Sequence, residues 1–272
     1  MPPETPSSFY HYHAFAHAFS GHFTRPFEHQ IDVQASSALP IIGGHGQARV
    51  ENFQFREFLS FRKGYTHVSG ADQEERVVGD DGKEKVIVSH NTLVTSTIEG
   101  LNLLDIVTAD RIVARLYSKH RGLEPEGSFN MVGSKFEGLR IADCDVKISL
   151  DLELFEKVPT FDAAVKAYDG KSDFYKIASN PFKDKKPAPK PNPYGSFLCS
   201  CVKEMQTTCP GVTRVGHSFS VPGFGKIYLG EVMIQHGERT LTMIRFEIGS
   251  AVSGIGTIVG INSNGSNYPP TG

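Results

Sequence analysis

The sequence predicts an all-β fold, a sandwich or barrel-like assembly with an internally repeated strand motif and a short helical insertion. Three observations support this prediction: a short motif that recurs along the chain, several stretches in which apolar and polar residues alternate, and one segment with helix-capping residues. The 272 residues include 27 Gly and 16 Pro, which suit many turns, and 19 Phe and 9 Tyr, which suit strands.

The repeated motif reads Glu, then Gly or Asn, then apolar-x-apolar-x-acid-apolar. It occupies residues 51–58, 99–106 and 137–144. Repetition at such intervals is typical of one supersecondary unit used several times. Gly and Asn accept positive φ more easily than other residues, so their exchange at the second position predicts a bulge or tight turn before a short strand. A looser echo at 229–234 has a shifted register and is not counted as a copy.

Each copy is predicted to place two apolar side chains in the core and one acid at the strand end. The three sets are Phe53/Phe55/Glu57, Leu101/Leu103/Asp105 and Leu139/Ile141/Asp143. The repeated acids have two interpretations: shared cation ligands, since calcium sites use carboxylates at turns, or ordinary turn caps that face solvent. We favour turn caps, because the motif lacks the dense Asp/Asn/Gly ladder of calcium loops.

Alternation predicts strands along most of the chain. The first, 9–23, has an Ala-rich face suited to close packing and an opposite face comprising Phe9, His11, His13, Phe15, His17 and Phe19. Further strands are expected at 31–35, 110–118 and 146–154. Hairpins are expected around the Gly-Asp-Asp-Gly turn of 79–82, and between 225–235 and 240–248.

Helix is predicted in one region alone. Thr160 is expected to cap a helix over 161–168 that Gly170 ends, and 172–178 is expected to form a second short helix. A Pro/Lys-rich stretch, 183–193, has the composition of an extended connector on the surface.

These elements divide the chain into three parts. Residues 1–158 form a repeated β domain, residues 159–196 form the helical insertion and the Pro/Lys-rich connector, and residues 197–272 form C-terminal β hairpins. We expect the third part to complete the same domain as the first.

Histidine is the strongest candidate for chemistry. His11, His13 and His17 share one face of the first predicted strand, because side chains two residues apart point the same way. Such a face presents imidazoles to one metal ion, and His45, His67 or an acid from another strand would supply a further ligand. Imidazole suits Zn, Cu, Fe and Ni alike, so the predicted cofactor is a transition metal of undetermined identity. The alternative is an aromatic surface that holds no metal.

Cysteine and serine offer weaker signals. The spacing of Cys199 and Cys201 fits neither a zinc knuckle nor a thioredoxin-type site. A disulfide from either residue to Cys209 and a pair of buried free thiols are both consistent with the sequence. The chain has no Gly-x-Ser-x-Gly elbow and no complete phosphate-binding loop. His217 and Ser218 are adjacent, but sequence neighbours rarely form a triad.

Composition argues against several classes of protein. The formal net charge of −2 provides no basic footprint for nucleic acid or for an anionic membrane surface. No run of 18 apolar residues occurs, so no transmembrane segment is predicted. The N-terminus lacks the basic and apolar regions of a secretory signal, which leaves either an intracellular protein or a mature or recombinant form.

Two segments carry a resemblance to a known family. Residues 96–104, followed by the Val-Thr-Ala-Asp-Arg-Ile-Val-Ala run of 107–114, resemble the central block of bacterial choice-of-anchor proteins. The stretches 225–229 and 241–243 are similar to that family's closing hairpin. The resemblance implies an all-β domain displayed outside the cell and brings no established catalytic residues. The sequence departs from the family's pattern because no signal peptide or anchor is visible in it and because it has an inserted helix and connector.

From these observations we expect a non-enzymatic structural or binding protein of bacterial origin, which binds a protein partner or associates with itself through strand edges. The family resemblance implies display at the cell surface, and the localisation is otherwise undetermined. One alternative is a metal-dependent enzyme that uses the His face of the N-terminal strand. Another is a carrier of a small hydrophobic ligand, held in a cavity lined by Phe and Tyr. Metal content distinguishes the first alternative, and ligand recovered with the purified protein distinguishes the second.

Overall fold

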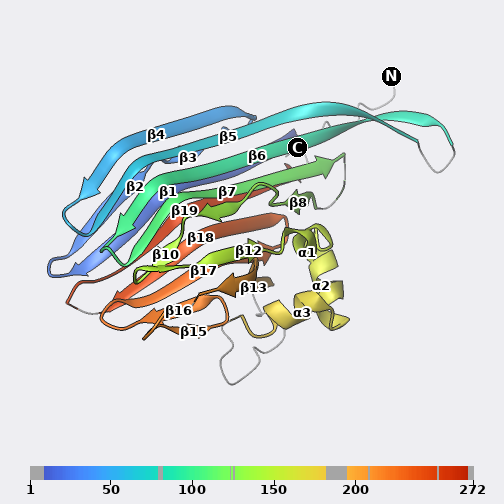
Figure 1. Cartoon of the computed structure of the whole chain (residues 1–272). Helices are drawn as coiled ribbons and strands as arrows, with labels where there is room; N and C mark the ends of the chain where they lie inside the picture. Colours follow the sequence, from blue (N-terminus) through green and yellow to red (C-terminus); the bar gives the residue numbers. More distant parts are fainter. Residues whose placement is uncertain are drawn as a thin grey trace.

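The computed structural model describes residues 9–78, 82–122, 124, 126–181, 195–207, 209–249 and 251–268. Two antiparallel sheets pack face to face, and a group of short helices lies at one end of them (Figure 1). Of the two arrangements expected from the sequence, the sandwich is the one observed. The turn predicted at 79–82 falls largely outside the described residues, and the connector predicted at 183–193 does so entirely.

The first sheet joins the two ends of the chain. In the described part of the chain it has nine strands in the order β15-β16-β17-β18-β19-β1-β2, with β13 paired to β17 and β3 paired to β1. The bounds are β1 Phe9–Arg25, β2 His29–Gln34, β3 Ser37–Ala38, β13 Ser196–Ser200, β15 Thr213–Val215, β16 Ser218–Val221, β17 Gly225–Gln235, β18 Glu238–Gly249 and β19 Ser253–Tyr268. Because β1 pairs with β19, the N-terminal and C-terminal parts share one sheet.

The second sheet holds the repeated motif. The described residues give it eight strands, in the order β11-β10-β7-β6-β5-β4, with β8 and β9 also paired to β7. The bounds are β4 Gly44–Phe55, β5 Leu59–Val78, β6 Glu84–Leu103, β7 Val107–Arg121, β8 Ser128–Asn130, β9 Lys135–Glu137, β10 Arg140–Ile141 and β11 Cys144–Asp145.

A small ribbon and three helices complete the described structure. They are β12 Lys147–Leu150, β14 Val202–Gln206, α1 Leu152–Glu156, α2 Phe161–Asp169 and α3 Asp173–Ala178. Thr160 caps α2 and Gly170 ends it, as predicted. The strand predicted over 146–154 is wrong in its second half, because Asp151 accepts a hydrogen bond from the amide of Leu154 and starts α1 there.

The insertion is fixed to the first sheet by packing and by a buried ion pair. The ring of Phe197 on β13 lies 5.3 to 5.6 Å from the rings of Phe161, Tyr168 and Phe174, measured between centroids. Glu126 accepts a 2.7 Å hydrogen bond from the amide of Phe161, and Arg239 lies 3.5 Å from the same carboxylate. Because both charged groups are buried, each compensates the desolvation of the other.

The repeated motif forms one line across the second sheet. Asn52, Gly100 and Gly138 all have positive φ, of 50°, 65° and 59°, which confirms the conformation predicted for this position. The pairs Glu51↔Lys63, Glu99↔Arg111 and Arg111↔Glu137 place the three copies in the same register, with β5 and β7 between them. Along each strand, buried and outward-facing side chains alternate, and at this line the alternation shifts by one residue. The three copies therefore act together as one bend in the sheet.

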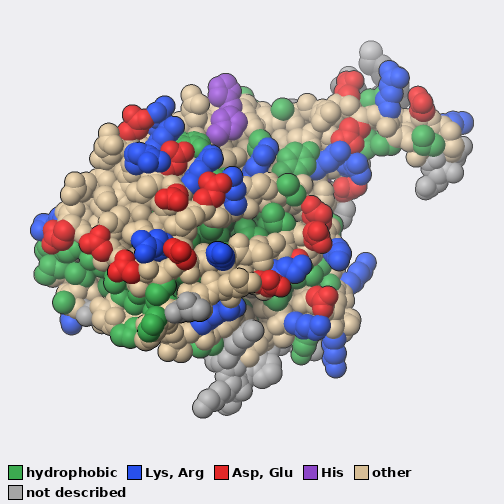
Figure 2. Space-filling model, in the orientation of Figure 1, with side chains coloured by type: hydrophobic (Ala, Val, Ile, Leu, Met, Phe, Trp, Pro, Cys, Tyr) green, Lys and Arg blue, Asp and Glu red, His purple; other side chains and the backbone are tan. Residues whose placement is uncertain are grey.

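The motif glutamates form a ladder of alternating charge on the outer face. The partners run in the order Glu51, Lys63, Glu99, Arg111 and Glu137. Figure 2 shows acidic and basic side chains interspersed over this face of the molecule. Opposite charges placed directly across neighbouring strands stabilise the pairing modestly.

The acids that end the motif lie in hairpin turns. Asp105 and Asp143 have φ of 54° and 62°, and the amide of Asp105 donates to Asn102 Oδ1 at 2.9 Å. This is the turn chemistry that we favoured over shared cation ligands.

The first sheet also bends along a line of residues with positive φ. Gly230 on β17 and Val259 on β19 have φ of 61° and 57°, and both lie opposite Met243 of β18. Gly230 belongs to the looser echo of the motif at 229–234. Next to this line, Ala18 and Phe19 of β1 are both buried. The prediction that Phe19 shares the His face is therefore wrong, because the alternation of β1 slips at the bend.

No helix in the described residues has the length and apolar character needed to cross a membrane.

Candidate functional site

The predicted histidine face exists on β1. His11, His13 and His17 point to the outer side of the first sheet, opposite the buried Tyr12, Ala14 and Ala16. His17 Nε2 lies 2.9 Å from Thr257 Oγ1, and the ring packs over Gly260, where a Cβ would collide with it. Burial lowers the pKa of His17 to about 4. His17 is thus held as a neutral ring against β19.

The structure does not assemble a metal site around these histidines. Among the described residues, no group of three or more His, Cys, Asp or Glu side chains is placed to hold a metal ion. His45 and His67, the further ligands considered, lie on β4 and β5 of the second sheet, whereas His11 to His17 lie on the outer face of the first. The His-based metal site and its transition metal stay predictions without structural support.

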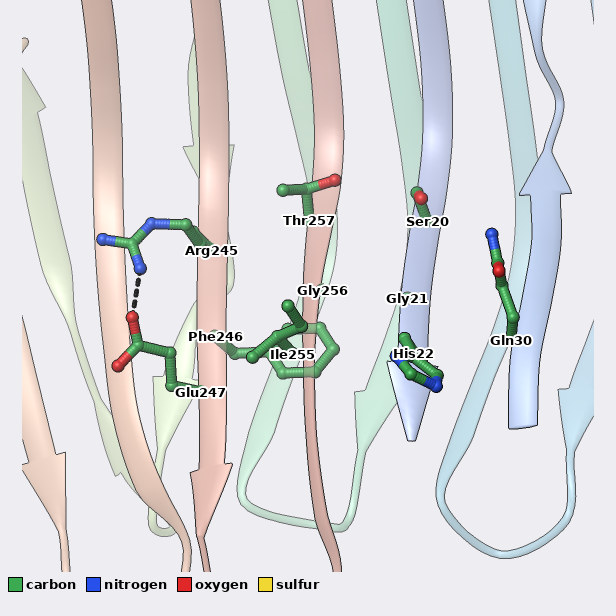
Figure 3. A pocket seen from close by; sticks show the side chains of 10 residues that line it. All are labelled: Ser20, Gly21, His22, Gln30, Arg245, Phe246, Glu247, Ile255, Gly256 and Thr257. Atoms are coloured by element: carbon green, nitrogen blue, oxygen red, sulfur yellow. Dashed lines mark hydrogen bonds and ion pairs between the residues drawn. The ribbon is translucent and has the colours of Figure 1, made fainter. Parts of the chain in front are cut away.

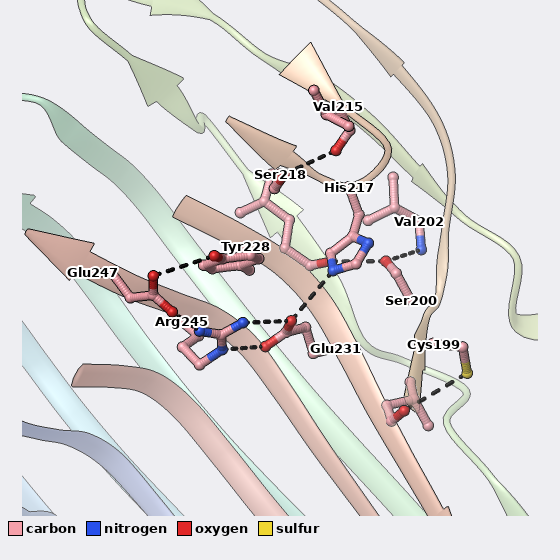
Figure 4. A network of polar contacts seen from close by, with 12 residues as sticks. Cys199, Ser200, Val202, Val215, His217, Ser218, Tyr228, Glu231, Arg245 and Glu247 are labelled. Atoms are coloured by element: carbon pink, nitrogen blue, oxygen red, sulfur yellow. Dashed lines mark hydrogen bonds and ion pairs between the residues drawn. The ribbon is translucent and has the colours of Figure 1, made fainter. Parts of the chain in front are cut away.

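A buried polar network lies on three neighbouring strands of the first sheet (Figure 4). Arg245 of β18 contacts Glu231 of β17 at two points: Nε lies 2.6 Å from Oε2 and Nη2 lies 3.0 Å from Oε1. His217, which directly precedes β16, places Nε2 3.3 Å from the same Oε1. Glu231 and His217 are 6% and 5% exposed, so the carboxylate depends on these two partners for its charge.

The same contacts control the ionisation of Glu231. Burial by itself raises the pKa of this carboxyl, but hydrogen bonds from His217 and Arg245 outweigh burial and hold the pKa below its ordinary value. Arg245 also pairs with Glu247, whose carboxylate accepts a 3.2 Å hydrogen bond from the Tyr228 hydroxyl. The guanidinium carbon of Arg245 lies 3.6 Å from the centre of the Tyr228 ring.

The network adjoins two hollows, because residues of the network line both of them. The wider one, a groove of about 290 Å³, runs across β18, β19, β1 and β2 (Figure 3). Arg245 and Glu247 stand at one end of this groove and Gln30 at the other, with Thr257, Ile255, Ser20 and His22 between them. The narrower one, a pocket of about 200 Å³, has His217 in its wall.

The hydroxyl groups of the two serines near His217 donate hydrogen bonds to backbone carbonyl oxygens. Ser218 donates its hydroxyl to the carbonyl oxygen of Val215 at 2.8 Å, and Ser200 donates to that of Leu229 at 2.8 Å. Neither hydroxyl therefore donates to His217, in agreement with the view that the adjacent His217 and Ser218 do not form a triad.

A second polar cluster lies at the root of the long β5–β6 hairpin. Asp72 Oδ1 accepts hydrogen bonds from Tyr12 Oη at 2.5 Å and from His90 Nδ1 at 2.6 Å. The ring of Tyr10 stacks on that of His90 at 4.0 Å, measured between centroids. Burial alone raises the pKa of the Asp72 carboxyl, but the bonds from Tyr12 and His90 bring it below its ordinary value. The cluster ties β1 of one sheet to β5 and β6 of the other.

The four cysteines form one disulfide and two buried free thiols. Cys209 bonds to Cys144 on β11, with their Cα atoms 5.5 Å apart, whereas Cys199 and Cys201 are free and buried. Of the two alternatives left open by the sequence, buried free thiols are observed for Cys199 and Cys201, and neither residue bonds to Cys209. Burial raises the pKa of Cys201 to about 12, so this thiol is unreactive at neutral pH.

Sequence reasoning singled out His217 but missed Glu231 and Arg245 of the buried network. Glu231 follows Gly230 within an otherwise apolar run, and Arg245 interrupts the run Ile244-Arg245-Phe246. Charged residues are rarely buried without partners, so single charges inside apolar strands were a usable signal. The sequence did not predict which charged residues contact one another, because those contacts depend on strand register.

Fold and site together define a β-sandwich protein with a charged network beneath the outer face of one sheet. A family model described as a domain of unknown function, DUF8256, matches residues 9–186 and 176–235. The chain belongs to this family. Comparison with curated proteins and with solved structures gave no match.

Proposed function

We propose that the protein is a non-enzymatic structural or binding protein that associates with a second copy of itself through the hairpin arm, residues 71–78 of β5 and 84–91 of β6. The observation that carries this proposal is the reach of the arm beyond the sandwich (Figure 1). Pairing of β4 with β5 ends at Gly44↔Gly70, while β5 and β6 remain paired out to Val78↔Glu84. Two-stranded ribbons are marginally stable alone, and their edges readily accept another strand.

One face of the arm carries three exposed valines among charged residues. Val78, Val86 and Val88 are 72%, 62% and 41% exposed. They continue the side of β5 and β6 that carries the buried Val68 and Val94 further down the same strands. The arm thus extends the inner surface of the sandwich beyond the sheet that covers it, and such a surface favours burial against a partner.

The charges on this face favour a second copy as that partner. Arg76 lies opposite Val86, and the neighbouring pairs on the same face contain Glu74 and Glu84. Two arms packed antiparallel bring Arg76 of each copy towards acids of the other while the valines meet. A contact of this kind is self-complementary, as a two-fold dimer requires.

The root of the arm is rigid enough to hold it in place. Glu75 accepts a 2.7 Å hydrogen bond from Ser89 and forms ion pairs with Lys119 and Arg121 of β7, at 2.5 and 3.2 Å. Together with the Asp72 cluster, these contacts fix the direction in which the arm leaves the sandwich. Less ordering entropy is then lost on association.

We further propose that the protein works in an oxidising compartment. The Cys144–Cys209 disulfide supports this location, since such bonds persist mainly outside the cytosol. The resemblance to choice-of-anchor proteins points the same way.

Sedimentation equilibrium over a range of protein concentrations tests the self-association. We expect wild type to dimerise and the variant Val86→Lys/Val88→Lys to dimerise at least about tenfold more weakly. The matched control is Ile42→Lys, because Ile42 is 88% exposed and is not part of the arm but of the turn between β3 and β4. Wild type that stays monomeric at every concentration, or an arm variant that dimerises like the control, contradicts the proposal.

A further inference from the structure

The narrower pocket of the first sheet differs from the other hollows in its charge. It is enclosed by α3 and the turn after it, by the start of β14 and by β15 with the turn that follows. Lys176, Lys203 and Arg214 supply cations, and His217 stands in the same wall. Among its described lining residues, none is acidic.

Two of the three cations lack a carboxylate partner among the described residues. Arg214 donates to the carbonyl oxygens of Met205 and Gly216, at 2.8 and 3.1 Å, so its charge is oriented but not neutralised. Lys203 is exposed and forms none of the observed ion pairs. Lys176 pairs with Asp173 of the same helix at 2.7 Å, and both side chains are exposed.

The buried acid that contacts His217 is already compensated. Glu231 lies behind His217, and its two oxygens are bound by Arg245. The buried network therefore supports the His217 ring without presenting a carboxylate to the pocket. Positive charges left uncompensated in a concave site attract anions strongly.

A basic groove on the other sheet shows the contrast. It is lined by Arg49, Lys63 and His67 among others. Arg49 is ion-paired with Glu51, and Lys63 lies between Glu51 and Glu99 in the charge ladder. In this groove, both the Arg and the Lys side chain are matched by an acid at a neighbouring position.

We propose that the pocket around Arg214 and Lys203 binds a phosphate or sulfate group, as the free anion or as the ester of a small molecule. A planar guanidinium held at its Nε and Nη1 atoms leaves its remaining N–H groups to meet two oxygens of a tetrahedral anion. A flexible ammonium supplies a second point of charge. The volume of about 200 Å³ accommodates the anion with a small attached group.

Isothermal titration calorimetry tests this site with inorganic phosphate, inorganic sulfate and phenyl phosphate, at an ionic strength held constant with sodium chloride. We expect saturable binding of at least one probe to wild type. Arg214→Gln and Lys203→Gln should each weaken it by about tenfold, as expected for the loss of one charged contact. Arg214→Lys, which keeps the charge, should retain more affinity than Arg214→Gln. Arg49→Gln, in the compensated groove, is the matched control and should bind as wild type does.

The three probes distinguish a pocket for a phosphate or sulfate ester from one for the free anion. Tighter binding of phenyl phosphate assigns the pocket to an ester, and equal or tighter binding of inorganic phosphate or sulfate assigns it to the free anion; both support the proposal. Lack of saturable binding to a wild-type protein with a normal thermal transition overturns it. So does binding that Lys203→Gln leaves unchanged, because this exposed side chain can be replaced without disturbing the fold. Neither result bears on dimerisation through the arm.

Discussion

Glu231 and Arg245, on adjacent strands of the first sheet, form a two-point ion pair of 2.6 and 3.0 Å beneath its outer face. Both side chains project from strands whose other residues are mostly apolar and buried. The bend at Gly230 places Glu231 there, because the slip in alternation at that line turns two consecutive residues of β17 outward. A feature of backbone conformation thus decides where a charge is buried.

Replacement of Glu231 by Gln should destabilise the fold by about 3 kcal/mol, because it leaves Arg245 without its main counter-charge. Urea denaturation at neutral pH measures the change. Glu51→Gln is the control: this exposed acid pairs with the exposed Arg49, so the loss should stay within about 1 kcal/mol. Equal losses for the two variants would show that the buried pair adds nothing beyond a surface contact.

Stability should fall in mild acid because of His17. Its pKa is about 4 in the folded protein, below the ordinary value of 6.5, so the unfolded chain binds more protons between these pH values. Stability from this group is present above pH 6.5 and is lost as the pH falls towards 4. His17→Gln should remove this dependence, which we expect to amount to about 2 kcal/mol across that window. Unfolding curves at pH 7.5 and 4.5 measure it, and equal pH dependence in both proteins contradicts the assignment.

Gly138 lies on the line of positive-φ residues that crosses the second sheet. Its replacement by a larger residue should destabilise the fold. A Cβ there would collide with the Asp110 side chain, and φ of 59° is strained for an L-residue. Gly138→Ala should therefore cost about 1–3 kcal/mol in thermal or urea unfolding. Asn52→Gly, at the equivalent position of the first copy, should change stability by less than about 0.5 kcal/mol. The interpretation of the repeat as a common bend fails if the two substitutions have the same effect.

Thiol chemistry should distinguish the two pairs of cysteines. Iodoacetamide should label no cysteine in the native protein, because Cys199 and Cys201 are buried and Cys144 and Cys209 are bonded. After denaturation without reductant, mass spectrometry should find Cys199 and Cys201 labelled and the other two linked. Replacement of both bonded cysteines by Ser should lower stability by about 4 kcal/mol, since the bond closes a loop with a sequence separation of 65 residues. Four labelled cysteines in the denatured sample would refute the bond.

Much of the architecture was readable from local pattern. The caps at Thr160 and Gly170, the hairpin of 225–248 and the positive φ of Asn52, Gly100 and Gly138 follow from residue chemistry within a few positions. The strand faces were also predictable, up to the point where a bend shifts the alternation. Phe19 was assigned to the wrong face for that reason, since the slip in β1 depends on the neighbouring strand β19.

The sequence by itself determined that this is an all-β chain with a repeated bend and a helical insertion, because turn conformation and alternation depend on residues close together in the chain. Tertiary structure alone decided that Cys144 meets Cys209, that His217, Glu231 and Arg245 converge, and that Lys203 and Arg214 share a pocket. These groups come from separate strands, and their meeting depends on strand order and register. Those are set by the packing of the whole core rather than by any local pattern.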